Sequence, residues 1–449
     1  MDYNPSIFKA YDIRGLVGKD FDNDFCEALG RAFVVHTGAK VVVAGRDMRG
    51  SSPGYFAALT RGIMKQGADV VDIGLVSTPM FYYAAAEYDL HDAGIMVTAS
   101  HNPSEYNGFK MVHGDAMPIG KGSGMEELKA LVEKNDFPDA PEGTLIETDI
   151  VEEYLDRLFE LVPAESIRNL TVAVDAGNGM GGVILPEIFK RLEAVKVHPL
   201  FWEPDGTFPN HEANPLKTET LKDLQAKIKE TRADIGIALD GDADRIGLVD
   251  EKGEVVSASE ILAMLAHVLL PGHTGEVATY NVSCGRVAPE EIKASGGVPL
   301  MTPTGHALIK HIISERDAIF GGELSGHFYF RDFGGVENTD YAMLLVLQLL
   351  SRQEKTLSEL VAPFRRYAHS GEINFEVDDA KAKMAAIRER FASEAVTVTE
   401  IDGLRIDFTD WWFGVRASNT EPLLRLNIEG ATRELMEAKK AELIAVIQE

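Results

Sequence analysis

Short apolar runs and amphipathic stretches alternate along the first part of the chain. Residues 41–45, 69–74 and 94–100 form apolar runs of strand length, and residues 52–66 carry apolar side chains at helical spacing. Apolar strands separated by amphipathic helices are typical of a mostly parallel sheet with helices on both faces. The pattern therefore predicts an α/β unit in this segment.

The same alternation starts again twice further along the chain. Residues 171–182 combine a strand with a glycine-rich turn, and residues 233–245 combine a strand with an acidic loop. A third stretch has helical spacing at 259–270 and 339–351, with a strand at 276–282 between them. We therefore expect three similar mixed α/β domains, since domains typically have about 100 to 150 residues.

From about residue 371 the pattern changes to short strands joined by turns. Strand-like runs lie at 373–377, 403–408, 411–418 and 423–430, and a charged helix is predicted at 432–449. This pattern indicates a smaller α+β domain at the C-terminus. The predicted fold class is therefore α/β.

Polar segments with turn-forming residues suggest where the domains meet. Such segments lie near residues 135–143 and around 249–254, and both are predicted to be joints. We expect four domains, with the boundaries 1–150, 151–253, 254–367 and 368–449.

The composition is that of a globular chain that is too long for one hydrophobic core. The chain has 449 residues, of which 45% are hydrophobic, and a formal net charge of −27. Such a charge argues against a nucleic-acid partner, because binding to a phosphate backbone depends on Lys and Arg. An anionic ligand would need positive charge that is gathered locally.

Two further features bear on where the protein works. Cys26 and Cys284 are the only cysteines and are far apart, so we expect no disulfide framework and a reducing compartment. The N-terminal segment has no apolar core of signal-peptide length, and the longest apolar run, around 342–350, is too short to span a membrane. We expect a cytoplasmic protein without a membrane partner.

A serine and a histidine directly follow the strand at 94–100. Ser100 and His101 lie where side chains of a parallel sheet reach a site, beyond the carboxyl end of a strand. A serine that carries a phosphoryl group needs a base or a metal beside it, and His101 or Lys110 can supply part of that environment. The same residues are also common in ordinary turns.

Three carboxylates at alternate positions form the most specific motif. Asp240, Asp242 and Asp244 flank a glycine and an alanine and are followed by Arg245. Oxygen ligands in this spacing indicate a divalent cation site, since packing three carboxylates without a cation would raise their pKa values. A helix-loop-helix calcium loop would use Glu251 as its twelfth residue, but the apolar segment 246–249 favours a metal loop within a sheet.

Two more polar loops are candidates for binding a substrate. The glycine-rich loop at 321–327 brings Glu323, Ser325 and His327 together, and His306 opens a helix just before it. The side chains of Glu323, Ser325 and His327 can bind sugar hydroxyls, and His306 can act as a general acid or base. The loop that starts at Arg416 gathers a guanidinium, two hydroxyls and an amide, a set that suits a phosphate dianion; its members are Arg416, Ser418, Asn419 and Thr420, with Arg425 after them.

These loops, in this order, resemble the α-D-phosphohexomutase family and most closely its phosphomannomutase/phosphoglucomutase branch. The segment Lys9 to Gly15, with the sequence KAYDIRG, is also similar to the N-terminal motif of that family, and Gly45-Arg46-Asp47 fits its next strand end. The resemblance covers the chain from Lys9 to Arg425. It implies four domains around a central cleft, which carry in order the phosphoserine, the metal, the sugar and the distal phosphate.

The resemblance also implies a role for each matching residue. Ser100 would be the phosphoserine, and with its phosphate would hold Mg²⁺ together with Asp240, Asp242 and Asp244. The residues near the reacting atoms would be His101, Lys110, Arg245, His306 and His327. The substrate-binding residues would be Tyr11, Arg14, Thr304, Gly305, Glu323, Ser325, Arg416, Ser418, Asn419, Thr420 and Arg425, with Tyr11 and Arg14 on the wall facing the phosphate loop.

The implied activity is the interconversion of hexose 6-phosphate and hexose 1-phosphate, for mannose or glucose or both, through a hexose 1,6-bisphosphate. Phosphoglucosamine mutase is the alternative within the family, but that branch usually has Gln at the place of Leu324 and Gly at the place of Asn419. A phosphosugar phosphatase and a sugar-phosphate-binding regulator are alternatives from other classes. The partners implied are small phosphosugars, and the oligomeric state stays open.

One segment departs from the pattern of the branch. Some bacterial members have a lysine where this chain has Ser283, within residues 281–286. Arg286 is the residue that can replace the lysine, and the sugar preference depends on this contact.

Overall fold

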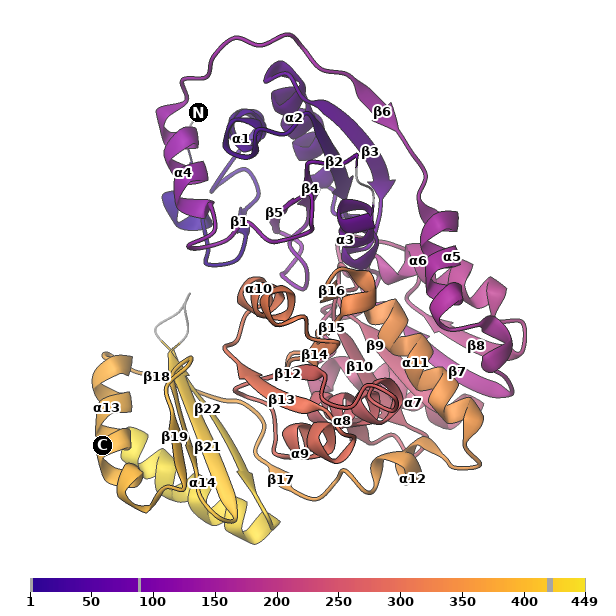
Figure 1. Ribbon diagram of the computed structural model, residues 1–449, viewed down its shortest axis with the longest axis vertical. Helices are drawn as coiled ribbons and strands as arrows, with labels where there is room; N and C mark the ends of the chain where they lie inside the picture. Colours follow the sequence, from indigo (N-terminus) through magenta and orange to yellow (C-terminus); the bar gives the residue numbers. More distant parts are fainter. Residues whose placement is uncertain (1–2, 88–89, 418–422, 449) are drawn as a thin grey trace.

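The computed structural model describes residues 3–87, 90–417 and 423–448 of the chain. Figure 1 shows four parts: the first sheet at the top, the C-terminal sheet at the lower left, and the other two sheets on the lower right. The predicted fold class, three similar mixed α/β domains followed by a smaller C-terminal domain, is confirmed.

The first sheet has six strands in the order β1-β5-β4-β2-β3-β6. Val42 and Val43 are neighbours on β2 but belong to two separate buried clusters, so helices cover both faces of the sheet as predicted. The strands are β1 (Ile13–Leu16), β2 (Val41–Arg46), β3 (Asp69–Leu75), β4 (Ala93–Val97), β5 (Tyr106–His113) and β6 (Leu145–Glu147), and the helices are α1 (Asn23–Thr37), α2 (Ser52–Lys65), α3 (Thr78–Glu87) and α4 (Met125–Lys134).

The second sheet has five strands in the order β11-β10-β9-β7-β8. Its strands are β7 (Leu170–Asp175), β8 (Val195–Leu200), β9 (Ile235–Leu239), β10 (Ile246–Asp250) and β11 (Val255–Val256), and its helices are α5 (Val151–Leu161), α6 (Gly181–Arg191) and α7 (Lys222–Thr231).

The third sheet has the order β13-β12-β14-β15-β16. Helix α8 starts with a capping box in which Ser257 and Glu260 satisfy each other's backbone N–H groups. The strands are β12 (Val277–Asn281), β13 (Val298–Thr302), β14 (Phe320–Gly322), β15 (Phe328–Phe330) and β16 (Val336–Glu337), and the helices are α8 (Ala258–Leu269), α9 (Val287–Ala294), α10 (His306–Arg316), α11 (Thr339–Arg352) and α12 (Leu357–Val361).

All three sheets contain the same arrangement of strands. In each, three parallel strands are followed by one antiparallel strand: β3-β2-β4 with β5, β8-β7-β9 with β10, and β13-β12-β14 with β15. The hairpin loops between the last parallel strand and the antiparallel one span residues 98–105, 240–245 and 323–327. These are the loops that carry Ser100, the three aspartates and Glu323, so each sheet presents its polar loop at the same topological position.

The segment around 249–254, which the sequence predicts to be a joint, is a hairpin turn instead. Strands β10 and β11 pair antiparallel on either side of it, and Gly253 adopts a φ of 87°. Asp250 accepts hydrogen bonds from the backbone N–H groups of Lys252 and Glu254, which closes the turn. The second sheet therefore continues to Val256. The polar residues that form this turn are also typical of linkers between domains, which is why the sequence predicts a joint here.

The C-terminal domain is an antiparallel sheet covered by two helices, and it has a hydrophobic cluster of its own. Strand β22 lies between β21 and two short strands, β17 and β18. The strands are β17 (Ala368–His369), β18 (Ile373–Glu376), β19 (Thr397–Thr399), β20 (Leu404–Asp407), β21 (Trp411–Ala417) and β22 (Leu423–Gly430), and the helices are α13 (Ala380–Phe391) and α14 (Arg433–Gln448).

Two arginines join the C-terminal domain to the third. The Arg286 guanidinium donates to the carbonyl oxygens of Phe408, Thr409 and Trp411, at 2.8 Å for the last two. In return, Arg405 donates to the carbonyl oxygens of Val282 and Cys284 at 2.7 and 2.9 Å. The expectation that Arg286 replaces a substrate-binding lysine is therefore wrong, because its guanidinium is occupied by the domain interface.

Within residues 3–87, 90–417 and 423–448, every helix is too short or too polar to cross a lipid bilayer.

Candidate active site

The hydroxyl group of Ser100 points from the first domain to the acidic loop of the second. Ser100 has a φ of 51°, in the left-handed region, and only 2% of its surface is exposed. Its Oγ donates to Oδ2 of Asp240 at 2.9 Å and lies 3.1 Å from Nδ1 of His101. The left-handed backbone conformation costs a residue other than glycine about 1 to 2 kcal/mol of free energy, so surrounding contacts must stabilise it at Ser100.

The three aspartates of the acidic loop are buried together. One carboxylate oxygen from each of Asp240, Asp242 and Asp244 lies within 4.8 Å of the other two. The backbone N–H groups of Asp244 and Arg245 donate to Oδ1 of Asp240, at 3.0 and 3.1 Å. Oδ1 of Asp242 is buried and has no hydrogen-bond partner, and the buried Oδ1 of Asp244 has only the His327 ring nearby, at 3.4 Å. Buried carboxylate oxygens without donors are the expected ligands of a hard cation.

Burial and mutual repulsion act strongly on the pKa values in this loop. Burial, and then the charges of Asp244 and Asp242, raise the pKa of Asp240 well above its usual value. Burial alone would also raise the pKa of Asp244, but Lys110 and His327 lower it well below its usual value. The cations that face Asp244 therefore stabilise its ionised form.

Lys110, on strand β5, supplies most of that compensation from the first domain. Its Nζ lies 3.0 Å from Oδ2 of Asp242 and forms a close ion pair with Oδ2 of Asp244. Although burial would lower the pKa of Lys110, the two aspartates raise it well above its usual value. Thr78, at the start of α3, also donates to Oδ2 of Asp242, at 2.7 Å.

His327 links the acidic loop to the third domain. Its Nε2 lies 3.4 Å from Oδ1 of Asp244, and its Nδ1 lies 3.0 Å from Oε2 of Glu323. Burial would lower the pKa of His327, but these carboxylates raise it to about 9. A protonated imidazole cannot accept a hydrogen bond, so we assign the 3.3 Å approach of Arg245 Nε to Nε2 as a close contact only. The two cations lie side by side at the acidic loop.

Glu323 is the polar centre of the third loop. It accepts hydrogen bonds from the backbone N–H of Gly305 at 3.1 Å and from the hydroxyl of Tyr329 at 2.8 Å. Burial would raise the pKa of Glu323, but His327, Gly305 and Tyr329 lower it to about 2. The Ser325 hydroxyl lies 2.8 Å from Nδ1 of His327. Glu323 is therefore an ionised acceptor, which suits a ligand with hydroxyl groups.

The other two histidines of the site are neutral. Burial, followed by the charges of Arg245 and Arg14, lowers the pKa of His101 well below its usual value. Burial and Lys310 do the same to the pKa of His306. Nδ1 of His306 lies 3.5 Å from Oε1 of Glu337, which also binds Nζ of Lys310 through its other oxygen at 2.9 Å.

The remaining contacts lead from the third domain to the C-terminal one. The Tyr11 hydroxyl donates to the carbonyl oxygen of Thr304 at 3.0 Å, and the backbone N–H of Thr304 donates to Asp402 at 3.1 Å. Asp402 in turn lies 3.9 Å from Nε of Arg416. Arg14, on strand β1, donates to the carbonyl oxygen of Ala99 at 3.2 Å, in the loop at 98–105 that carries Ser100 and is called the serine loop below. The described loops of all four domains are thus connected by a chain of polar contacts from Ser100 to Arg416.

Arg416 and Arg425 lie directly opposite each other on β21 and β22, so their side chains share one face of the sheet. Arg425 also lies 3.4 Å from Glu372. The two guanidiniums gather positive charge where the sequence predicts an anion-binding loop. The other predicted members of that loop, Ser418, Asn419 and Thr420, lie outside the described residues.

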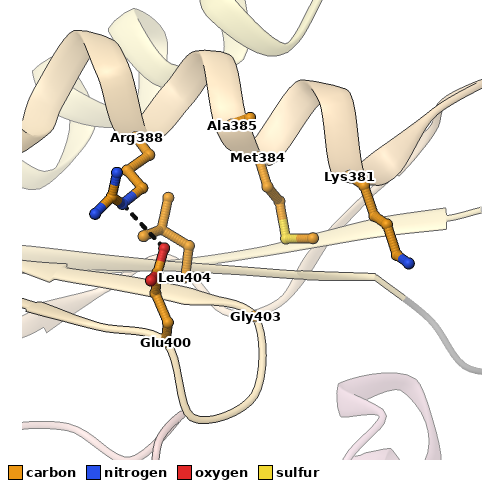
Figure 2. A pocket seen from close by; sticks show the side chains of 7 residues that line it. All are labelled: Lys381, Met384, Ala385, Arg388, Glu400, Gly403 and Leu404. Atoms are coloured by element: carbon orange, nitrogen blue, oxygen red, sulfur yellow. Dashed lines mark ion pairs between the residues drawn. The ribbon is translucent and has the colours of Figure 1, made fainter.

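A separate pocket on the C-terminal domain contains none of the predicted site residues. Figure 2 shows this pocket, of about 240 Å³, between helix α13 and the turn before β20. Arg388 and Glu400 form an ion pair at 2.9 Å across it. Its lining consists of Lys381, Met384, Ala385, Arg388, Glu400, Gly403 and Leu404.

Some residues of the site are not predicted by the sequence motifs. Thr78 follows strand β3 and is the first residue of helix α3. Because sites of parallel sheets lie beyond the carboxyl ends of their strands, this position could have indicated that Thr78 belongs to the site. Asp402 and Glu337 lie in a turn and in a two-residue strand, and their sequence neighbours give no comparable indication.

Taken together, the arrangement can hold a divalent cation and a phosphoryl group beside the Ser100 hydroxyl. Phosphoryl transfer needs a positioned nucleophile and neutralisation of charge. The cluster offers both, since it contains a buried hydroxyl, three carboxylates and three cationic side chains.

Comparison with known protein families agrees with this chemistry. Four family models match the chain in order, and all four are described as phosphoglucomutase/phosphomannomutase domains. They are alpha/beta/alpha domain I at residues 5–139, domain II at 152–253, domain III at 257–367 and the C-terminal domain at 372–446.

Relatives of known name match over nearly the full chain. A phosphomannomutase from Salmonella montevideo is 38% identical, with 99% of each chain covered. A phosphomannomutase from Vibrio cholerae is 39% identical, with 99% of this chain and 98% of that protein covered. The solved structure of a phosphoglucomutase/phosphomannomutase family protein from Burkholderia thailandensis has a TM-score of 0.90 at 34% identity, and covers 100% of this chain and 98% of that one.

The charge balance of the site predicts a large effect of removing Lys110. Lys110→Met should lower the free energy of unfolding by about 3 to 5 kcal/mol, because it leaves two buried carboxylates without their cation. The measurement is urea unfolding in a chelating buffer. The control is Lys129→Met, since the ion pair of Lys129 with Glu133 is exposed and should contribute less than about 1 kcal/mol. Equal losses for both variants would contradict the assigned charge balance.

Proposed function

The chain belongs to the phosphoglucomutase/phosphomannomutase family and is a phosphohexomutase, and we propose that it carries the phosphoryl group on Ser100. The observation that carries this proposal is the 2.9 Å contact between Ser100 Oγ and Asp240, at the edge of the acidic cluster. The reaction interconverts hexose 6-phosphate and hexose 1-phosphate through a hexose 1,6-bisphosphate, which also serves as an activator.

The cation of the site is Mg²⁺ in this proposal. Asp240, Asp242 and Asp244, with an oxygen of the phosphoserine, would be its ligands, and the close approach of the three carboxylates and the unpartnered Oδ1 of Asp242 support this assignment. When bound, Mg²⁺ neutralises charge on the phosphoryl group and makes the phosphorus easier to attack.

The transfer itself is an in-line displacement at phosphorus. A hydroxyl group of the hexose monophosphate attacks phospho-Ser100, a new oxygen–phosphorus bond forms, and the bond from Oγ of Ser100 breaks. The proton of the attacking hydroxyl passes to a neutral base, for which His101 and His306 are the candidates, since their pKa values are low. The leaving Oγ of Ser100 takes up a proton in exchange, so that the serine hydroxyl is restored and the base is neutral again. The bisphosphate then reorients, and its other phosphoryl group returns to Ser100.

The cations and polar groups around the serine divide the remaining tasks. Lys110, Arg245 and protonated His327 stabilise the negative charge of the transferring group. Glu323 and Ser325 bind hydroxyl groups of the sugar. The distal phosphate is bound by Arg416 and Arg425 with Ser418, Asn419 and Thr420, and by Tyr11, Arg14, Thr304 and Gly305 on the opposite side.

The substrates are mannose and glucose phosphates in this proposal. The names of the relatives support mannose, and Leu324 and Asn419 argue against the glucosamine branch. With Ser283 in place of a lysine and Arg286 committed to the domain interface, one contact to the sugar is absent, so we expect a relaxed preference between the two. Parallel coupled assays with mannose, glucose and glucosamine 1-phosphates test this.

We also propose that the protein works in the cytoplasm. Cys26 and Cys284 are both buried free thiols, which is typical of proteins in reducing compartments.

Ser100→Ala should abolish nearly all mutase turnover while leaving the fold intact. The hydroxyl is the phosphoryl carrier, and the change removes a single oxygen from a loop. Intact-mass measurement should show a species about 80 Da heavier in the wild type and none in the variant. Ser104→Ala, an exposed serine of the same loop, is the matched control and should behave as the wild type. Full turnover by Ser100→Ala would refute the assignment.

Removing the cation or one of its ligands should have the same effect as removing the carrier. Exhaustive chelation or Asp242→Asn should reduce turnover at least about a hundredfold, since a preorganised charge in such a site is worth that much. Restoring Mg²⁺ should recover the wild type but not the variant. Asp223→Asn, an exposed acidic residue of the same domain, should stay active. Undiminished activity after chelation would exclude the proposed role of the cation.

Arg416→Ala should raise the Michaelis constant for both 1-phosphate substrates about ten- to a hundredfold. The reason is the loss of charge-assisted hydrogen bonds of roughly 1.5 to 3 kcal/mol to the distal phosphate. Phosphorylation of Ser100 in the isolated protein should persist. Arg388→Ala, which removes an exposed arginine of the same domain, is the control (Figure 2). Unchanged kinetics for Arg416→Ala would mean that the phosphate is bound elsewhere.

A further inference from the structure

Arg49 is buried beneath the serine loop, and all five of its guanidinium N–H groups have a partner. Its Nε lies 3.2 Å from Oδ2 of Asp47. The two terminal nitrogens donate to four backbone carbonyl oxygens, those of Pro103 and Tyr106 at 2.7 and 3.0 Å, and those of Ser100 and Asn102 at 2.8 and 2.7 Å. Only 1% of the surface of Arg49 is exposed.

Three of the four carbonyl oxygens lie in the loop between β4 and β5, and the fourth belongs to Tyr106, the first residue of β5. The carbonyl oxygen of Ser100 is buried, and Arg49 supplies it with a donor, as it does the three partly buried carbonyl oxygens; that of Pro103 also accepts the backbone N–H of Tyr106 at 3.1 Å. Because one planar guanidinium binds all four, it fixes the path of the loop on both sides of His101. One of the four is the carbonyl of Ser100 itself, whose left-handed conformation needs such support.

Arg49 is anchored on its other side by the strand end that carries it. Asp47 accepts the backbone N–H of Arg49 at 3.0 Å and the hydroxyl of Ser52 at 2.5 Å. Asn107, at the start of β5, donates to the hydroxyls of Ser51 and Ser52 at 2.8 and 3.0 Å. The guanidinium therefore lies on a rigid support and not on a flexible stem.

The second domain covers this assembly. The Phe208 ring lies over the guanidinium, 5.1 Å from Cζ to the ring centre. Gly206 packs so closely that a Cβ there would lie 2.5 Å from Cα of Arg49, and a Cβ on Gly241 would lie 2.4 Å from the carbonyl oxygen of Ser100. The acidic loop and residues 206–208 of the second domain thus pack tightly against the serine loop, on the side that faces away from the first domain.

We propose that Arg49 is a positioning residue that holds the Ser100 hydroxyl in line for phosphoryl transfer, with Phe208 of the second domain closing over it. This inference rests on the proposed role of Ser100 as the carrier. Arg49 acts through the loop backbone, since its five N–H groups are all used by Asp47 and the loop carbonyls. It should therefore affect the rate of transfer and not the binding of the sugar phosphate.

The decisive variant is Arg49→Lys, which keeps the positive charge. The ammonium group of lysine has three N–H donors on a single nitrogen, whereas the guanidinium has five N–H donors arranged in a plane, so lysine cannot bind all four carbonyl oxygens at once. The matched control is Arg46→Lys. Arg46 lies three residues earlier, binds Asp72 at 2.8 Å and stacks on Phe56 at 4.4 Å, so it loses comparable contacts away from the serine loop.

Two rates are measured on the full chain. The first is the rate at which Ser100 gains its phosphate from glucose 1,6-bisphosphate, followed by intact mass in quenched samples. The second is steady-state turnover with glucose 1-phosphate. Arg49→Lys should slow phosphorylation and kcat at least about tenfold, because a small misplacement of a reacting atom is enough for such a loss. Its Michaelis constant should stay within about twofold, and Arg46→Lys should leave both rates within about twofold of the wild type.

A purely structural role predicts a different result. Arg49→Lys would then lower the thermal unfolding midpoint, while its folded fraction would gain phosphate at the rate of the wild type, and this would overturn the inference. If Arg49→Lys does not fold, Phe208→Leu decides: slower phosphorylation with an unchanged Michaelis constant supports the inference, and an unchanged rate overturns it. If the wild type itself gains no phosphate on Ser100, the proposed function fails together with the inference.

Discussion

The burial of three carboxylates beside one serine hydroxyl is the constraint on which the rest of the site depends. Asp240, Asp242 and Asp244 are almost completely excluded from solvent, and burial, followed by the charges of Asp244 and Asp242, raises the pKa of Asp240 well above its usual value. Lys110 approaches them from the first domain, and His327 approaches from the third. The charge of one loop therefore has to be balanced by residues from two other domains, and this balance couples domain assembly to the formation of the site.

The repeated strand arrangement explains how loops so far apart in sequence meet. Each of the first three sheets turns back after its last parallel strand, and each of those hairpins carries one polar loop. A single continuous hydrophobic cluster runs from one face of the first sheet through the second and third domains, so these hairpins are held in fixed relative positions. The C-terminal domain has a cluster of its own and is attached through Arg286, Arg405 and the contact of Asp402 with Thr304. The proposed sites for the reacting and the distal phosphate thus differ in how firmly they are joined to the rest of the molecule.

Much of the fold could be predicted from the sequence because strand ends and apolar runs are local features. The positions of Ser100 and of the aspartate loop follow from such strand ends, and the structure brings them to 2.9 Å. Contacts between domains are not local, and there the prediction was incomplete or wrong. The sequence places Arg286 at the sugar, but its guanidinium binds carbonyls of the C-terminal domain. A local pattern misleads in one place only: the polar turn before Val255 resembles a joint but connects two strands of one sheet. The support of Ser100 by Arg49 was not predicted, because the four carbonyls that define it lie more than fifty residues further along the chain.

The proposed mechanism requires the phosphoryl group to move from Ser100 to a sugar and not to water. The most direct measurement is a single turnover with protein that carries radiolabelled phosphate on Ser100, mixed with an excess of unlabelled glucose 6-phosphate or mannose 6-phosphate. The proposed mechanism predicts that the label leaves the protein and appears first in the hexose 1,6-bisphosphate and then in hexose monophosphate. Label that appears mainly as inorganic phosphate, or that stays on the protein while the sugar turns over, would contradict it.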